Sequence, residues 1–248
     1  MLANAGQSGV KRVALECGGK SAFLVLAGCR DLAAAARTLA REIFLNQGQT
    51  CSAPSRLIVE KSVHARFLEL VLREAAAFVP ANPLAPTTRL GALVSEEQLA
   101  KVERYVESGT REGARLVLGG TRAAPVRGGA YFVPTVFDGV NARMTIAREE
   151  IFGPVLSVIP VADAPEAVRV ANDSPYGLAA AVWTDDIDVA LGASRTLRAG
   201  TVHVNSYGED DLSAPFGGFG QSGNGFKEKS LLALDAYSQR KTTWIKLR

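Results

Sequence analysis

The chain has 248 residues, 47% of them hydrophobic and 21% charged, which is the composition of a folded globular protein rather than a disordered one. Its net charge of +3 arises from Lys and Arg interleaved with acidic residues, so binding to nucleic acid is not expected. Three Cys without paired spacing indicate a reducing compartment, and neither a signal peptide nor a membrane-spanning apolar run is evident, so the sequence predicts a cytoplasmic protein without membrane contact.

Short apolar runs alternate with amphipathic helical patterns along most of the chain. The run Ala22–Leu26 is continuously apolar, as in a strand buried on both faces, and Asp31 can cap a helix that follows to about Leu45. Ser95 and Gln98 form a capping box that opens another helix, to about Gly109. Further strands are predicted at 13–15, 57–59, 116–118, 131–136, 155–161, 179–184, 201–205 and 236–245, and further helices at 63–78, 165–171, 187–197 and near 231. This alternation predicts an α/β fold with a mostly parallel twisted sheet and helices on both faces.

Cys51 lies in a polar turn between a helical pattern and a strand. A lone Cys is usually a small buried residue, but the amides and glycine of 46–49 are groups that a core does not need, and they favour a nucleophile. A Cys/His hydrolase is disfavoured because His64 opens a surface helix and His203 faces away from its valine neighbours. The Cys and His positions show no ligand spacing, so no metal site is expected.

Glu16 is the only carboxylate in residues 1–30. Between Leu15 and the Cys17–Lys20 run it would be poorly solvated, which would raise its pKa and make it a useful general base. The alternative is a surface Glu paired with Lys20, and spacing alone favours this alternative.

Four stretches taken together are more specific. The runs 15–20 (LECGGK), 44–51 (FLNQGQTC), 149–155 (EEIFGPV) and 215–218 (PFGG) resemble motifs of the aldehyde dehydrogenase superfamily, in the same order and with familiar spacing. The resemblance extends through the linking stretches to essentially the whole chain. It implies the three-layer catalytic domain of that family, in which an aldehyde is oxidised to a carboxylic acid with NAD or NADP.

The resemblance also implies a role for each matching residue. Cys51 would add to the aldehyde and carry the thiohemiacetal and thioester, with its backbone N–H as part of an oxyanion hole. Glu16 would activate the hydrolytic water. The other implied sites are a cofactor site at Gly18, Glu150 and Phe152, and a substrate tunnel at Asn205 and Phe216.

Two features depart from the family pattern. Cys17 stands where the family usually has Leu, which we interpret as a packing replacement, with oxidation or a mixed disulfide as the alternative.

Almost all of the cofactor-binding half that precedes the Glu motif in the family is absent from this sequence. We therefore expect residues 1–20 to be a remnant of that half, 21–226 the catalytic domain and 227–248 a C-terminal helix and oligomerisation strand. We also expect the isolated chain not to turn over with NAD, and apolar surface to be bared.

The substrate class has a weaker indication. One branch of the family acts on ω-aminoaldehydes, including γ-glutamyl-aminobutyraldehyde, and it is the branch most similar to residues 206–213, 221–225 and 229–231. The acids Glu209, Asp210 and Asp211 would favour a cationic substrate. The alternative is that these three acids form a solvated loop. A homo-oligomer is expected for the intact enzyme. Two other readings remain open at this point: a non-enzymatic domain that assembles through its C-terminal strand, and a cofactor-free thiol esterase.

Overall fold

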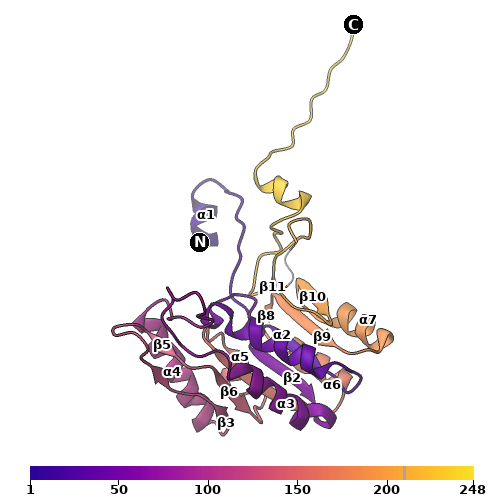
Figure 1. Ribbon diagram of the computed structural model, residues 1–248. Helices are drawn as coiled ribbons and strands as arrows, with labels where there is room; N and C mark the ends of the chain where they lie inside the picture. Colours follow the sequence, from indigo (N-terminus) through magenta and orange to yellow (C-terminus); the bar gives the residue numbers. More distant parts are fainter. Residues whose placement is uncertain (209–210) are drawn as a thin grey trace.

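A seven-stranded sheet forms the centre of the computed structural model, which describes residues 1–208 and 211–248 (Figure 1). Its strands lie in the order β10-β9-β1-β2-β7-β6-β3, and each neighbouring pair is parallel except the edge strand β3, which runs antiparallel to β6. The strands are β1 (Ala22–Val25), β2 (Arg56–Glu60), β3 (Arg115–Leu118), β6 (Thr135–Asp138), β7 (Val155–Val161), β9 (Ala179–Trp183) and β10 (Thr201–Val204). The predicted mostly parallel α/β sheet is confirmed.

Helices cover both faces of this sheet, and the period of two along the strands divides the core accordingly. Phe23 and Val25 of β1 pack with the helices of one face, and Leu24 with those of the other. The first face carries α2 (Leu32–Phe44) and α3 (Lys61–Ala75). The second carries α4 (Glu96–Arg111), α5 (Thr145–Arg148), α6 (Ala164–Asn172) and α7 (Ile187–Thr196). The central strands are therefore buried on both sides, as their continuous apolar runs predict.

The helix starts follow their capping residues. The carboxylate of Asp31 accepts a hydrogen bond from the Ala34 N–H at 2.8 Å, and the Ser95 hydroxyl accepts one from Gln98 N–H at 3.1 Å. These contacts satisfy backbone donors that a helix N-terminus leaves free. The remaining short elements are α1 (Leu2–Gln7), η1 (Leu45–Gly48), β4 (Arg122–Ala123), β5 (Tyr131–Phe132), β8 (Tyr176–Gly177), β11 (Phe219–Gly220) and η2 (Leu231–Ala236).

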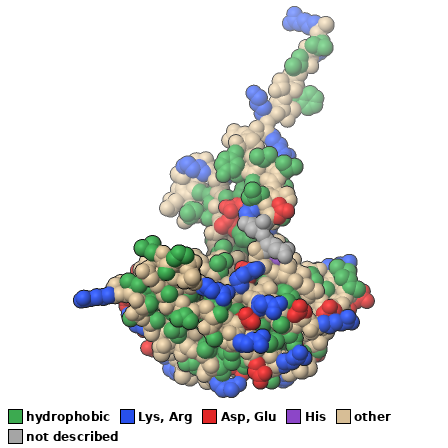
Figure 2. Space-filling view, in the orientation of Figure 1, with side chains coloured by type: hydrophobic (Ala, Val, Ile, Leu, Met, Phe, Trp, Pro, Cys, Tyr) green, Lys and Arg blue, Asp and Glu red, His purple; other side chains and the backbone are tan. Residues whose placement is uncertain are grey.

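Both ends of the chain project from the same side of this body (Figure 1). They touch each other where the Arg12 guanidinium donates to the Asp235 carbonyl at 3.0 Å. The last residues lie away from the body, and Figure 2 shows hydrophobic side chains along this projection. Trp244, in this segment, has 92% of its surface exposed. The bared apolar surface that was predicted concerned the contact with the cofactor-binding half, and it stays a prediction.

Two predicted strands are wrong. The runs 13–15 and 236–245 contain no strand, because in this chain no neighbouring strand lies beside them to receive their hydrogen bonds. Conversely, the short helix α1 lies in a segment where no helix was predicted. No helix in residues 1–208 and 211–248 combines the length and apolar character that a membrane crossing requires. The same residues hold no cluster of three or more potential metal ligands.

Candidate active site

Cys51 is placed by a tightly wound turn between α2 and β2. Asn46 and Gln47 both have left-handed backbone conformations, with φ of 48° and 59°, and Gly48 follows with φ of 70°. The side chains of Asn46 and Gln49 each donate to the other's carbonyl, at 3.0 and 3.2 Å. Left-handed non-glycine residues are costly and concentrate at functional sites. The amides that the sequence places before Cys51 thus hold a strained turn that ends at the thiol.

A second turn packs directly against the first. A Cβ added at Gly48 would overlap the carbonyl of Gly153, so only glycine allows the two backbones to approach this closely. Phe152 in this second turn is also left-handed, with φ of 57°. The Gln98 amide of α4 donates to the carbonyls of Ile151 and Phe152 at 3.0 and 2.7 Å. Phe152 is therefore held beside the Cys51 turn by a hydrogen-bonded helix side chain.

The segment from Glu16 to Gly19 crosses over the Cys51 turn. A Cβ added at Gly19 would lie 2.7 Å from the Cys51 carbonyl oxygen, and one at Gly18 would overlap the Glu150 carboxylate. The Gly19 N–H donates to Glu150 Oε1 at 2.9 Å. The two glycines thus bring the backbone against Cys51 and Glu150, as expected for a GG pair at a site of close approach.

The two acidic residues of the EEIFGP motif, Glu149 and Glu150, make different contacts. Glu149 accepts a hydrogen bond from the Tyr105 hydroxyl at 2.8 Å, which turns its carboxylate toward α4. Glu150 instead faces the Gly18–Gly19 segment. Glu150 is also only partly exposed, whereas Glu149 is exposed.

One open cavity of about 380 Å³ brings most of the predicted residues together. Its lining residues are Glu16, Cys17, Gly18, Cys51, Gln98, Lys101, Glu150 and Phe152. Both predicted catalytic residues and all three predicted cofactor residues are in this set. Neither histidine is: His64 contacts Asp138 at 2.7 Å, and the His203 ring lies 4.9 Å from that of Tyr207.

Burial sets the electrostatics of the two catalytic candidates. Desolvation raises the pKa of the Cys51 thiol, opposed by the N–H groups of Ser52 and of Cys51 itself, while Glu150 and Glu16 raise this pKa further. Desolvation also raises the pKa of Glu16, with Glu228 adding to the effect and Lys227 opposing it. Both carboxylate oxygens of Glu16 are buried and lack a hydrogen-bond partner among the described residues. An unpaired carboxylate of raised pKa is a suitable general base near neutral pH.

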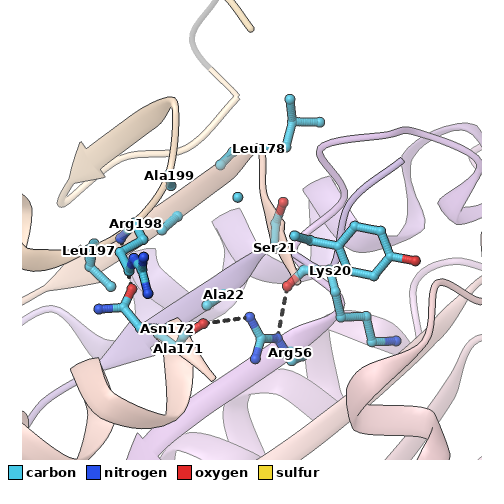
Figure 3. Close-up of a pocket in the computed structure, with 14 residues that line it drawn as sticks. Lys20, Ser21, Ala22, Arg56, Ala171, Asn172, Leu178, Leu197, Arg198 and Ala199 are labelled. Carbon is cyan, nitrogen blue, oxygen red and sulfur yellow. Dashed lines mark hydrogen bonds between the residues drawn. The ribbon is translucent and has the colours of Figure 1, made fainter. Parts of the chain in front are cut away.

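A buried cationic pair lies at the start of β1 and β2. Figure 3 shows the Arg56 guanidinium bonded to the carbonyls of Lys20 and Ala171, at 2.8 and 2.9 Å. Lys20 is 1% exposed and its ammonium has no partner within the described part of the chain. Burial, with Arg56 nearby, lowers the pKa of Lys20 to about 7, against the opposing effect of Glu150 and Glu149. The surface pairing of Glu16 with Lys20 that spacing favoured is therefore wrong.

Two cavity residues were missed from the sequence. Gln98 and Lys101 are three residues apart, in the first turns of α4, so they share one face of the helix. The only available signal was their position just after the Ser95 capping box, and polar residues there are typical of any solvated helix start. Their contact with the cavity depends on tertiary packing.

Asn205 and Phe216 do not line this cavity. Asn205 follows β10, at the opposite end of the parallel strands from Cys51, and its amide pairs with the Thr184 backbone, accepting at 2.9 Å and donating at 2.8 Å. Phe216 forms a two-hydrogen-bond bridge with Glu228. The structure thus gives both residues local structural contacts.

Cys17 differs from its predicted role. It was interpreted as a packing replacement for Leu, but its side chain is exposed and lines the Cys51 cavity. Its position follows from the bridge between Glu16 and Gly223 and from the Cys17 N–H, which donates to Ser222 O at 3.0 Å.

Comparison with known proteins gives consistent matches. The model of the aldehyde dehydrogenase family matches residues 1–243. The NADP/NAD-dependent aldehyde dehydrogenase PuuC of Escherichia coli (strain K12) is 45% identical over 247 residues, which is 100% of this chain and 49% of PuuC. The chain thus spans about half the length of the curated relatives it matches.

Solved structures agree in fold. The γ-glutamyl-γ-aminobutyraldehyde dehydrogenase of Burkholderia cenocepacia J2315 superposes with a TM-score of 0.96 at 52% identity, covering 100% of this chain and 50% of that one. An indole-3-acetaldehyde dehydrogenase in complex with NAD⁺ gives a TM-score of 0.96 at 53% identity, covering 99% and 50%.

Proposed function

Because this chain belongs to the aldehyde dehydrogenase family, we propose that it carries the nucleophile and the general base of an NAD(P)-dependent oxidation of an aldehyde to a carboxylic acid. The observation that supports this most strongly is the single cavity that Cys51, Glu16 and Glu150 share. Residues 21–226 are proposed as the catalytic domain, residues 1–20 as part of a cofactor-binding unit, and 227–248 as an oligomer contact.

The first step assigned to this site is thiol addition. The Cys51 sulfur forms a bond to the aldehyde carbon, and the thiol proton passes to the carbonyl oxygen to give a thiohemiacetal. The Cys51 N–H donates to that oxygen as negative charge develops on it. Desolvation raises the pKa of the Cys51 thiol, so the proton leaves the sulfur as the carbon–sulfur bond forms and not beforehand.

The second step assigned to this chain's residues is hydrolysis of the thioester that remains on Cys51 once the thiohemiacetal has given up a hydride, for which a nicotinamide nucleotide would be the acceptor. Glu16 removes a proton from water, the resulting hydroxide adds to the acyl carbon, and the carbon–sulfur bond breaks to release the carboxylic acid and the thiolate. A carboxylate with a raised pKa accepts this proton more readily than an ordinary glutamate does. Neither Glu16 oxygen has a hydrogen-bond partner within the described residues, so no existing hydrogen bond has to break before Glu16 accepts a proton.

The cavity also suits a nicotinamide nucleotide. A side chain at position 18 would fill the space against Glu150, so glycine leaves a cradle there. The Glu150 carboxylate can accept hydrogen bonds from vicinal ribose hydroxyls, Lys101 adds a cation, and Phe152 offers an aromatic ring. The nucleotide, NAD or NADP, would supply the hydride acceptor. The described cavity contacts suit only one end of a dinucleotide, so we expect weak binding and no NAD turnover by this chain alone.

An aminoaldehyde is the proposed substrate class. Support comes from the similarity to the γ-glutamyl-γ-aminobutyraldehyde dehydrogenase, while the equal similarity to an indole-3-acetaldehyde dehydrogenase provides the competing class. Of the acidic run, Glu209 and Asp210 lie outside the described residues, and Asp211 is exposed and accepts from Ser213 N–H at 2.7 Å. Rates of the intact enzyme on amino- and alkyl aldehydes of equal length test this assignment, and equal rates would contradict it.

A homo-oligomeric enzyme in the cytoplasm is the corresponding proposal for the intact protein. The exposed apolar side chains of the C-terminal projection support self-association. Light scattering over a concentration series measures the mass in solution, and a monomer at every concentration would contradict it. Assembly as a non-enzymatic partner through a C-terminal strand has less support, because the described residues 236–245 form no strand.

Acylation by an activated ester tests the catalytic roles without cofactor. We expect p-nitrophenyl acetate to acylate Cys51, and Glu16→Gln to retain acylation but accumulate the acyl-enzyme because deacylation slows. Intact-protein mass spectrometry follows both steps. Glu97→Gln, at an exposed position of α4, is the matched control and should behave as wild type.

The same experiment separates the competing readings. Acylation at another residue, or unchanged deacylation in Glu16→Gln, would contradict the proposal. Fast multiple turnover of esters without any response to NAD and aldehyde, in the intact enzyme, would favour the thiol esterase.

A further inference from the structure

Two of the three cysteines line the same open cavity. Cys17 is exposed and Cys51 is half-buried, and both contribute to the cavity wall. The third, Cys29, is buried in the loop between β1 and α2 and lines a different part of the core. The cavity therefore holds a pair of free thiols of unequal exposure, with the third thiol as an internal control.

The backbone carrying Cys17 lies against the backbone carrying Cys51. Gly19 is two residues after Cys17, and a Cβ at Gly19 would be 2.7 Å from the Cys51 carbonyl oxygen. On its other side, the Cys17 N–H is bonded to Ser222 O at 3.0 Å. Cys17 is thus held at a fixed place beside the Cys51 turn rather than on a free end.

We propose that Cys17 is a modification site whose oxidation closes a disulfide with Cys51. A hydroperoxide is the oxidant. Hydrogen peroxide converts the Cys17 thiol to a sulfenic acid and is itself reduced to water. The Cys51 sulfur then attacks the Cys17 sulfur, a sulfur–sulfur bond forms, and hydroxide leaves and takes the Cys51 proton as a second water. Two thiols supply the two electrons that the peroxide accepts.

The order of the two steps follows from exposure. Peroxide reaches the exposed Cys17 directly, whereas Cys51 is more enclosed and its thiolate is disfavoured by desolvation. A disulfide requires its two Cα atoms to lie about 4.4–6.8 Å apart. Cys17 and Cys51 line one cavity, and closure of the bond reports whether their backbones reach this spacing.

The disulfide would occupy the proposed nucleophile and would be reversed by a thiol reductant. It would protect Cys51 from irreversible oxidation while peroxide persists, because a disulfide does not proceed to the sulfinic acid in the way a free sulfenic acid does. This inference does not depend on the dehydrogenase activity proposed above, since it concerns only the two thiols.

Peptide mapping of the full 248-residue chain tests the proposal. Trypsin places the three cysteines in three different peptides, 13–20, 21–30 and 42–56. After brief treatment with hydrogen peroxide and blocking of free thiols, we expect a non-reduced digest to contain peptide 13–20 joined to 42–56. The intact chain should lose the mass of two hydrogen atoms, and dithiothreitol should restore it.

Variants assign the bond. Cys29→Ser should form the cross-linked peptide as wild type does, and Cys17→Ser should lose it. In Cys17→Ser, peroxide should convert Cys51 to sulfinic acid instead of leaving it recoverable. The proposal is overturned if wild type yields only oxyacids, intermolecular dimers, or a cross-link that includes Cys29. The wild-type result alone decides the matter if a variant fails to fold.

Discussion

Replacing Lys20 by Met should make the protein more stable at neutral pH. Lys20 is 1% exposed, and its ammonium lacks a hydrogen-bond partner in the described chain, so it occupies a site that favours an uncharged side chain. Met has a similar length and volume, so it fills the same space without creating a cavity. The change removes a group that loses much of its charge on folding.

The magnitude follows from the pKa of Lys20, which burial lowers from 10.5 to about 7. Between these values the unfolded chain binds more protons than the folded chain, so the stability of the wild type rises as the pH is raised. One pKa unit corresponds to about 1.4 kcal/mol, so the cost of Lys20 at pH 7 is about 4 kcal/mol, of which about 3 kcal/mol disappears by about pH 9.5.

Urea unfolding at a series of pH values measures this effect. The free energy of unfolding of Lys20→Met should exceed that of wild type at pH 7, and the difference should shrink as the pH rises. Lys61→Met, at an exposed position at the start of α3, should run parallel to wild type at every pH. A constant difference between Lys20→Met and wild type from pH 7 to 9.5, or a less stable variant at pH 7, would refute the reasoning.

Three further substitutions probe the cavity and the turn that carries Cys51. Gly18→Ala places a methyl group on the Glu150 carboxylate and should lower the free energy of unfolding by about 1–3 kcal/mol, measured by urea titration. Burial raises the pKa of Glu16, so the folded state binds this proton more tightly than the unfolded state, and wild type should lose stability as the pH rises through that pKa. Glu16→Gln should not show this loss, and thermal melting from pH 4 to 8 measures the difference. Tyr207→Phe removes a 2.5 Å hydrogen bond to Ser52 O beneath the thiol turn and should cost about 1–2 kcal/mol in unfolding free energy.

Each of these has a contrasting result. Gly6→Ala meets no atom within 4 Å and should be neutral, so an equal effect at Gly6 and Gly18 would remove the steric argument. A Glu16→Gln variant with the pH dependence of wild type would show that Glu16 is solvated in the folded state. An unfolding free energy of Tyr207→Phe equal to that of wild type would mean that water replaces the hydroxyl contact.

Much of the fold was accessible because its signals are local. The apolar run at Ala22, the cap at Asp31 and the capping box at Ser95 each act within one element, and the structure has the corresponding strand and helices there. The predicted strand at 236–245 failed for a complementary reason. Its residues have strand character, but a strand also needs a partner, which a local pattern does not report.

The site residues also differ in how far local sequence could indicate them. Cys51 could be selected because a thiol among amides is unusual in a core. Glu16 could not be selected from spacing, which favoured a surface pairing with Lys20, and it was assigned through the resemblance of the four motifs. Lys101 could not, because a lysine in a helix start is ordinarily solvated, and only packing turns it to the cavity. The pairing of Asn205 with Thr184 is a contact between two strand ends, which spacing does not encode.

The anchoring of the segment that carries Glu16 has a consequence for the newly made protein. Glu16 forms its bridge with Gly223, and the neighbouring Leu15 N–H donates to Asn224, 209 residues later in the chain. On a ribosome, the stretch that holds Cys51 emerges long before the residues that fix Glu16 in place. Contacts of such separation are slow to form. The thiol is therefore synthesised early, whereas the contacts that fix Glu16 beside it form only after residues 223 and 224 have been made.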